Sequence, residues 1–265
     1  MPDLAGGRVI SGDREIAHQT LMGRALRAAA GFAALGVAAG DAVALVLRND
    51  FPFFEASYAA QMLGAYCVPV NWHGKAPEIG YVLRDCAAKA VVAHADLLPQ
   101  VLPVLPEGVP LLIVPTPPEI AAAYDLLADQ CAAPAGTITW DEWLAGHEPL
   151  ANPGAGGISS MIYTSGTTGN PKGVKRLNLG PEFVQIVGVV AREVLGFLPE
   201  QPVRTVITGP AGRLAARAPA SPEAVLGAAR AGVGDGVVAF ARELPQEESA
   251  RPAAITDAES MKLFI

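Results

Sequence analysis

The sequence is poor in the residues that crosslink small proteins or bind metals. Its 265 residues include three cysteines, an odd number without a C-x-x-C spacing, which excludes a disulfide scaffold. Cys67, Cys86 and Cys131 are therefore expected to be buried thiols of a reduced, cytoplasmic protein. The four histidines are scattered without the spacing of metal ligands, so no metal-binding residue is predicted.

Long apolar runs and basic clusters are also missing. Polar residues and prolines interrupt every apolar stretch before it reaches the roughly 20 residues of a membrane-spanning helix. The first residues lack the basic segment followed by an apolar one that marks a leader. The net charge is −7 and no basic stripe is visible, which excludes a nucleic-acid surface. We expect neither a membrane span nor a nucleic-acid partner.

The composition indicates a folded protein with a large core. Hydrophobic residues make up 51% and charged residues 17% of the chain, whereas a disordered protein combines low hydrophobicity with high net charge. The length suits one large domain or two small ones.

Apolar strands alternate with amphipathic helices along most of the chain. A small hairpin is predicted at 8–16, helices at 18–35, 51–64, 77–85 and 181–197, and strands at 42–47, 66–70, 89–93, 109–114, 159–163 and 203–208. Prolines weaken a helix at 97–105, and the loose segment 115–157 is expected to hold one short helix at 140–145. The alternation predicts an α/β fold with a layered, mostly parallel sheet flanked by helices.

One loop carries the chemistry of a binding site. The stretch YTSGTTGNPKGV at 163–174 follows a predicted strand directly. Glycines let backbone N–H groups approach a ligand closely, hydroxyls add donors, and a lysine adds a mobile positive charge. These groups suit a chain of phosphates better than the alternative, a glycine-rich surface loop with polar filler. The candidate phosphate ligands are Thr164, Ser165, Gly166, Thr167, Thr168, Gly169 and Lys172.

Other nucleotide-binding and catalytic motifs do not fit. A Walker A loop requires G-x-x-x-x-G-K-[ST], but counting from Gly166 places Pro171 where the second glycine belongs. No G-x-G-x-x-G opens a helix after the first strand, which excludes a Rossmann fingerprint. A hydrolase would need a nucleophile elbow, G-x-S-x-G, which is absent.

The loop closely resembles the signature of the adenylate-forming superfamily, which contains acyl-CoA synthetases, luciferases and the adenylation domains of peptide synthetases. The resemblance extends over about residues 8–210, through GVAAGDAVALVLRN at 36–49, GAYCVPVN at 64–71 and EIGYVLRD at 78–85. NWH at 71–73 and AHA at 93–95 look most like bacterial fatty-acid or related carboxylic-acid CoA ligases.

This resemblance implies a ligase reaction in two halves. A carboxylic acid attacks the α-phosphorus of ATP to form an acyl-adenylate and pyrophosphate, and the thiol of coenzyme A then displaces AMP. By the same resemblance, the seven loop residues would hold the β- and γ-phosphates of ATP with Mg²⁺. Their role would be electrostatic stabilisation of the leaving pyrophosphate, so no catalytic residue is assigned.

The chain departs from this family after residue 210. Family members are roughly twice as long, and residues 211–265 contain none of their later motifs, including the ribose-binding aspartate and the catalytic lysine. We therefore expect a partial AMP-binding domain at 1–210 and a divergent alanine-rich tail at 211–265, frameshifted or disordered. A frameshift, a deletion and a natural short paralogue are all open origins.

Such a chain is expected to be inactive alone. Two alternatives to the ligase function stay open. The chain could be a non-catalytic nucleotide or phosphate binder, or a fragment that needs another chain to complete its sheet. Self-association through an uncovered part of the sheet is a further expectation.

Overall fold

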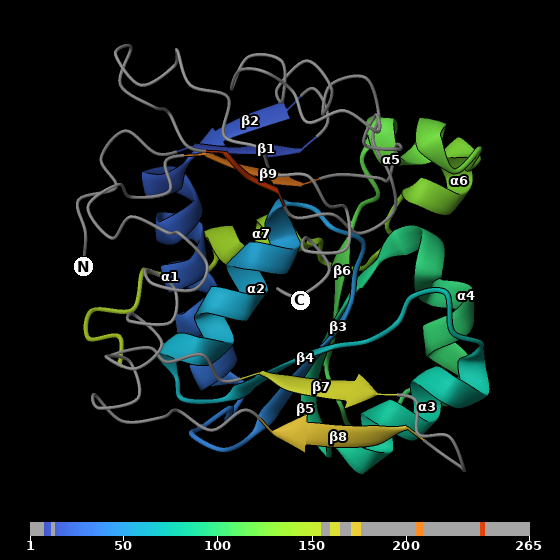
Figure 1. Ribbon diagram of the computed structural model, residues 1–265, viewed down its shortest axis with the longest axis horizontal. Coiled ribbons are helices and arrows are strands. Elements are labelled where there is room, and N and C mark those ends of the chain that lie inside the picture. Colours follow the sequence, from blue (N-terminus) through green and yellow to red (C-terminus); the bar gives the residue numbers. More distant parts are fainter. Residues whose placement is uncertain are drawn as a thin grey trace, which may run out of the picture.

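A parallel four-stranded sheet forms the centre of the molecule (Figure 1). The computed structural model describes residues 8–11, 14–154, 160–164, 171–175, 205–208 and 239–241. The sheet contains, in spatial order, β4 (Tyr66–Pro69), β3 (Ala42–Val46), β5 (Ala88–His94) and β6 (Leu111–Val114). The predicted α/β fold class with a layered, mostly parallel sheet is therefore confirmed.

Strand β3 is buried on both faces, as its unbroken apolar sequence predicts. Val43 and Leu45 point into the core on one side, while Ala44 and Val46 point into the core on the other. The first side is covered by α1 (His18–Ala34), α2 (Phe51–Met62) and α7 (Trp140–Ala145). The second side is covered by α3 (Ala76–Asp85) and α4 (Leu98–Val101) (Figure 1).

The end of α1 shows how local sequence directs the chain back into the sheet. Gly36 adopts a left-handed backbone with φ of 82°, and its N–H bonds to the Ala33 carbonyl. Val37 follows and is buried, with its N–H bonded to the Phe32 carbonyl. The glycine therefore ends the helix near residue 35, where the sequence predicts its end, and lets Val37 enter the core.

Prolines divide the weak helix predicted at 97–105 into short pieces. They are the 3-10 turn η1 (Ala95–Leu97), α4, and a second 3-10 turn, η2 (Leu102–Val104). Pro99 and Pro103 lie in the first turns of α4 and η2, where no N–H donor is required.

The segment 115–157 contains more structure than the single helix predicted from its sequence. Besides α7, it forms α5 (Pro118–Ala123) and α6 (Ala128–Cys131). Each of these two buries one side chain, Ile120 or Cys131, so neither is long enough to show an apolar period. The prediction of one helix is wrong because tertiary burial, and not periodicity, stabilises these turns.

The N-terminal hairpin is present but belongs to a different sheet from β3. Strands β1 (Arg8–Ser11) and β2 (Arg14–Ala17) pair antiparallel, and β1 pairs in parallel with β9 (Thr205–Thr208). Strand β10 (Ala239–Ala241), which belongs to the proposed tail, pairs antiparallel with β9. The remaining strands, β7 (Met161–Thr164) and β8 (Lys172–Lys175), form a separate antiparallel pair.

Two predicted parts of the fold lie outside the described residues. They are the helix expected at 181–197 and most of the proposed tail at 211–265. Among the described residues, no helix is long and apolar enough to cross a membrane.

Two glycines of α1 provide a matched test of core packing. A Cβ at Gly31 would lie 2.4 Å from Trp143 Cζ2, and that ring is stacked against Trp140, so it has little room to move. A Cβ at Gly23 would meet nothing within 4 Å. We expect Gly31→Ala to lower the free energy of unfolding by about 1–3 kcal/mol. Gly23→Ala should raise it by up to about 1 kcal/mol, because alanine favours helix.

Urea unfolding followed by circular dichroism measures both changes. Equal effects of the two variants would contradict the packing of α7 on α1.

Candidate functional site: the loop hairpin and the carboxyl edge of the sheet

The predicted phosphate loop is closed at its base by the β7–β8 hairpin. Thr164 and Lys172 are directly paired in the antiparallel register, so their side chains lie on the same face. Both are exposed. The other predicted ligands, Ser165, Gly166, Thr167, Thr168 and Gly169, lie outside the described residues. The structure therefore brings together the first and last members of the predicted set.

The opposite face of the hairpin is directed toward the protein. Met161 is 5% exposed and packs in the core cluster beneath α3 and α4. Tyr163, two residues further along β7, packs against the same cluster. On β8, the ammonium group of Lys175 lies 5.2 Å from the centre of the Tyr66 ring. Because strand side chains alternate between faces, this packing directs Thr164 and Lys172 away from the core.

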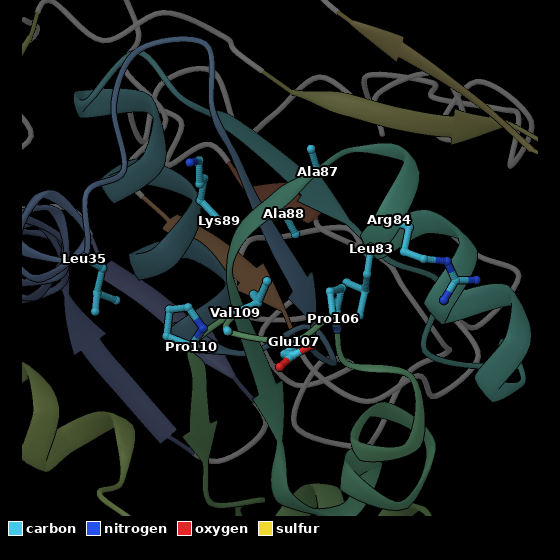
Figure 2. Close-up of a pocket in the computed structure, with 11 residues that line it drawn as sticks. Leu35, Leu83, Arg84, Ala87, Ala88, Lys89, Pro106, Glu107, Val109 and Pro110 are labelled. Carbon is cyan, nitrogen blue, oxygen red and sulfur yellow. The ribbon is translucent and has the colours of Figure 1, made fainter.

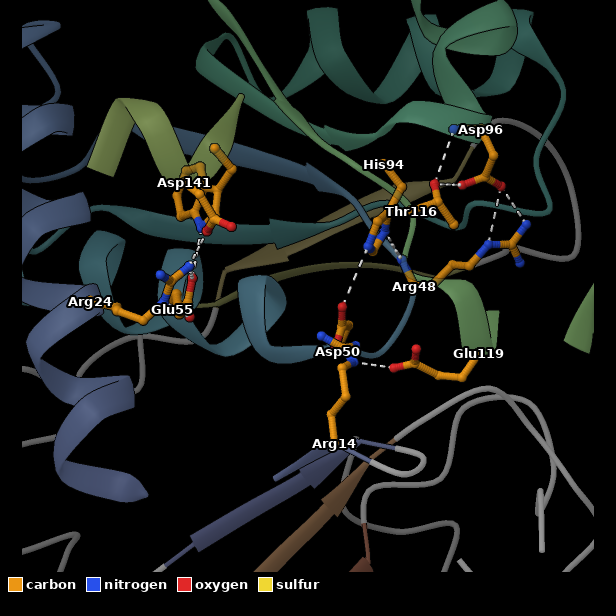
Figure 3. Close-up of polar contacts among 11 residues, drawn as sticks. Arg14, Arg24, Arg48, Asp50, Glu55, His94, Asp96, Thr116, Glu119 and Asp141 are labelled. Carbon is orange, nitrogen blue, oxygen red and sulfur yellow. Dashed lines mark hydrogen bonds and ion pairs between the residues drawn. The ribbon is translucent and has the colours of Figure 1, made fainter. Parts of the chain in front are cut away.

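Charged side chains gather at the carboxyl ends of the central strands (Figure 3). Arg48 follows β3 and is 5% exposed, and its Nη2 lies 2.7 Å from Asp96 Oδ2, just after β5. Thr116, which follows β6, donates from Oγ1 to the other Asp96 oxygen at 2.6 Å. Carboxyl-end residues of three strands are thus joined by one ion pair and its hydrogen bond.

Aromatic rings enclose the Arg48 guanidinium. Its central carbon lies 4.1 Å from the centre of the Trp72 ring and 3.8 Å from that of Tyr124. The ring faces offer favourable electrostatics to a cation that has lost most of its water. A buried cation is therefore compensated by one carboxylate and two π systems.

His94 connects this pair to a second one. Its Nδ1 accepts the Arg48 backbone N–H at 3.0 Å, so the ring proton is on Nε2, 3.9 Å from Asp50 Oδ2. Asp50 accepts a hydrogen bond from Arg14 Nη2 at 2.5 Å, and Arg14 pairs with Glu119. Burial alone would raise the pKa of Asp50, but the His94 side chain and the Arg14 charge lower it below its usual value.

A third group joins the helices above the sheet. Glu55 of α2 is fully buried and accepts from Arg24 Nε at 2.5 Å and from the Trp140 indole at 2.7 Å. Burial raises the pKa of Glu55, although both hydrogen bonds act in the opposite direction. The contact ties α1, α2 and α7 together.

Two cavities lie at opposite ends of the parallel strands. One, of about 580 Å³, is lined by Lys89, Glu107 and Pro110 among others, at the amino ends of β5 and β6 (Figure 2). The other, of about 570 Å³, is at the carboxyl ends, where Arg14 and Asp50 line it. Open α/β sheets bind ligands at their carboxyl ends, where the strand order reverses, here between β3 and β5. In this protein that crevice holds ion pairs of the chain itself.

Sequence reasoning missed these buried charges. It considered polar residues such as Asp50 only as interruptions of apolar stretches, and histidines such as His94 only as lacking the spacing of metal ligands. The available signal was position, because both residues come at or just after the end of an apolar strand. Among the described residues, no group of three or more histidine, cysteine or acidic side chains could hold a metal ion.

Comparison with known proteins identifies the family. The profile of the AMP-binding enzyme family matches residues 6–176, which include most of the described residues and the predicted loop. The chain belongs to the AMP-binding enzyme family. The resemblance seen in the loop and its flanks is thereby confirmed.

Several relatives in this family are acid–CoA ligases by name. The long-chain-fatty-acid–CoA ligase FadD13 of Mycobacterium tuberculosis is 32% identical over 176 residues, which cover 62% of this chain and 30% of that protein. The indoleacetate–CoA ligase of Aromatoleum aromaticum is 32% identical over 170 residues, covering 61% of this chain and 30% of the relative. The chain thus spans about 30% of the length of these relatives.

Solved structures share the fold. The anthranilate CoA ligase AuaEII, in complex with anthranoyl-AMP, aligns with a TM-score of 0.56 and 25% identity, over 69% of this chain and 34% of its own. The apo form of MatB from Rhodopseudomonas palustris aligns with a TM-score of 0.56 and 20% identity, over 76% of this chain and 37% of its own. The α/β architecture is therefore that of adenylate-forming CoA ligases, of which the chain covers a part.

The Arg48–Asp96 pair should contribute much more stability than an exposed pair of the same type. Replacing Asp96 with Asn leaves a buried guanidinium without its counter-charge, and we expect a loss of about 3–5 kcal/mol in the free energy of unfolding. Asp141→Asn is the matched control, because the Asp141 side chain is 73% exposed and pairs with Arg24. That variant should lose less than about 1 kcal/mol.

Chemical denaturation of the two variants provides the comparison. A similar small loss in both would show that the carboxyl-edge network contributes little to the fold.

Proposed function

We propose that this chain supplies the triphosphate-binding part of an ATP-dependent acid–CoA ligase. The observation that carries the proposal is the pairing of Thr164 with Lys172 at the base of the loop, within a family match that includes that loop. The hairpin presents a hydroxyl and an ammonium on one exposed face, which suits a polyanionic ligand.

The names of the relatives support the proposed reaction class. FadD13 and the indoleacetate ligase join different carboxylic acids to CoA, as their names state. We propose that this protein likewise uses a carboxylic acid, ATP and coenzyme A. An acid oxygen would attack the α-phosphorus and release pyrophosphate, and the CoA sulfur would then replace AMP at the acyl carbon.

Lys172 and the loop would act on the leaving group. As the bond between the α- and β-phosphates breaks, negative charge builds up on the pyrophosphate oxygens. A fixed cation and hydroxyl donors near those oxygens stabilise the transition state more than the ground state. Mg²⁺ would enter with ATP as part of the substrate, since this ion prefers phosphate and hydroxyl oxygens and usually retains several waters.

The remaining parts of the proposal rest on other observations. All three cysteines are buried free thiols, which suits the reducing cytoplasm, where we place the protein. Among the described residues, each edge of the central sheet carries a single bridge, Cys67 to Ser160 and Ile113 to Thr139. Edges that are covered this briefly support the proposed self-association. We also retain 1–210 as the partial AMP-binding domain and 211–265 as a divergent tail.

Binding of ATP tests the assignment of the loop. Lys172→Ala should weaken ATP binding roughly tenfold, the equivalent of one lost charge-assisted hydrogen bond. Lys175→Ala is the control, because it removes the same charge from the same strand on the opposite face. It should change the affinity less than about twofold. Isothermal titration calorimetry measures both, with melting temperatures to confirm folding.

An equal loss in the two variants would indicate a general charge effect and contradict the proposed contact. Binding of ATP without any turnover is the result expected if the chain is a non-catalytic nucleotide binder.

We further propose that these 265 residues alone do not complete the reaction. The described part provides the hairpin for phosphates but no identified group that aligns a carboxylate with the α-phosphorus, and such alignment is worth about 7–11 kcal/mol of barrier. Purified protein free of host ligases should form no AMP that depends on both fatty acid and CoA. A turnover of about 1 per second or faster would contradict this proposal.

A further inference from the structure

Tyr163, which immediately precedes the predicted phosphate ligand Thr164, is held both at its hydroxyl and at its ring. Its hydroxyl donates to Asp85 Oδ2 at 2.5 Å, and Asp85 is the last residue of α3. The ring lies across β8 at Gly173, where a Cβ would come within 2.9 Å of Tyr163 Cζ. Glycine therefore makes room for the ring, and the carboxylate then fixes the hydroxyl.

The protonation state of Tyr163 favours this bond. Burial, the hydrogen bond to Asp85 and the negative charge of Asp85 all raise the pKa of Tyr163. The phenol consequently remains a donor at neutral pH. A neutral donor to an ionised acceptor makes a stronger hydrogen bond than one between two neutral groups.

The hairpin needs an anchor near the loop. A two-stranded sheet is marginally stable by itself, so its position depends on contacts with the rest of the protein. At the start of β7, Met161 is buried in the core and the neighbouring Ser160 bridges to Cys67 of β4. Tyr163 and Asp85 provide the corresponding contact at the other end of the strand, one residue before Thr164.

We propose that Tyr163, held by Asp85, is a positioning residue that orients Thr164 and Lys172 for the phosphates. Resting on the proposed function, this assigns to α3 a direct part in setting the geometry of the ATP site. Loss of the hydroxyl would leave Met161 and the core intact. It would release the loop end of the hairpin, so that ordering Thr164 and Lys172 becomes a cost of binding.

Tyr163→Phe tests the role because it keeps the ring over Gly173 and removes only the donor. We expect ATP affinity to fall about three- to tenfold, with a melting temperature close to that of the unmodified chain. Asp85→Ala should cause a similar loss, and the double variant should lose no more than either single one, since both remove one interaction. Asp85→Asn retains an acceptor oxygen and should restore part of the affinity.

Tyr81→Phe is the matched control. Tyr81 lies on α3 one turn before Asp85, and its hydroxyl is 3.5 Å from the other oxygen of the same carboxylate. This variant removes a phenol hydroxyl from the same cluster without touching the hairpin. Its ATP affinity should be unchanged.

Amide hydrogen exchange gives a readout without nucleotide. Exchange at Lys172, Gly173, Val174 and Lys175 should become several-fold faster in Tyr163→Phe and remain unchanged in Tyr81→Phe. Normal ATP affinity and normal exchange in Tyr163→Phe would overturn the positioning role while the proposed function stands. No ATP binding by the unmodified chain would overturn the proposed function, and this role with it, whatever the exchange shows.

Discussion

The contacts of the buried Arg48 guanidinium set the arrangement of the loops at the carboxyl ends of the central strands. Residues after all four central strands take part in these contacts. Arg48 itself follows β3, and its guanidinium contacts Trp72, which follows β4, and Asp96, which follows β5. Asp96 in turn accepts a hydrogen bond from Thr116, which follows β6. Removing a charge from water is costly unless the charge is paired, so the loops that carry the partners of Arg48 have little freedom in where they lie. Burial of the apolar sheet stabilises the domain, and the contacts of Arg48 fix where the loops at the carboxyl edge of the sheet lie.

The same constraint explains why the candidate site lies elsewhere. The crevice between the carboxyl ends of β3 and β5 is the usual ligand position of an open α/β sheet. Here Arg48, Asp50, His94 and Asp96 occupy it and pair with one another. The groups proposed to meet phosphates are instead on an added hairpin, β7–β8. Met161 attaches that hairpin to the core cluster beneath α3 and α4, and Tyr163 attaches it to α3 itself. The central sheet and its helices thus carry the β7–β8 hairpin, whose outer face is exposed to solvent.

Much of the fold could be predicted from the sequence because its signals are local. The strand predicted at 42–47 and the helix predicted at 18–35, which Gly36 ends, each depend on neighbours a few residues away, and both predictions are confirmed. The short helices α5 and α6 could not be predicted, because each is stabilised by burying one side chain against distant elements. The pairing of β1 with β9 joins segments almost 200 positions apart, and no local pattern reports such a partner.

For the site, the sequence by itself predicts the kind of chemistry, because glycines, hydroxyls and a lysine in one loop are typical of phosphate binding wherever the loop lies. It also determined the family, through residues that the family profile matches. Only the tertiary structure decided that Thr164 and Lys172 share the outer face and that Asp85, 78 positions earlier, holds the neighbouring tyrosine. The reason is physical: a hydrogen bond depends on where two atoms lie in space, and for residues far apart in the chain that is settled only when the sheet and its helices pack.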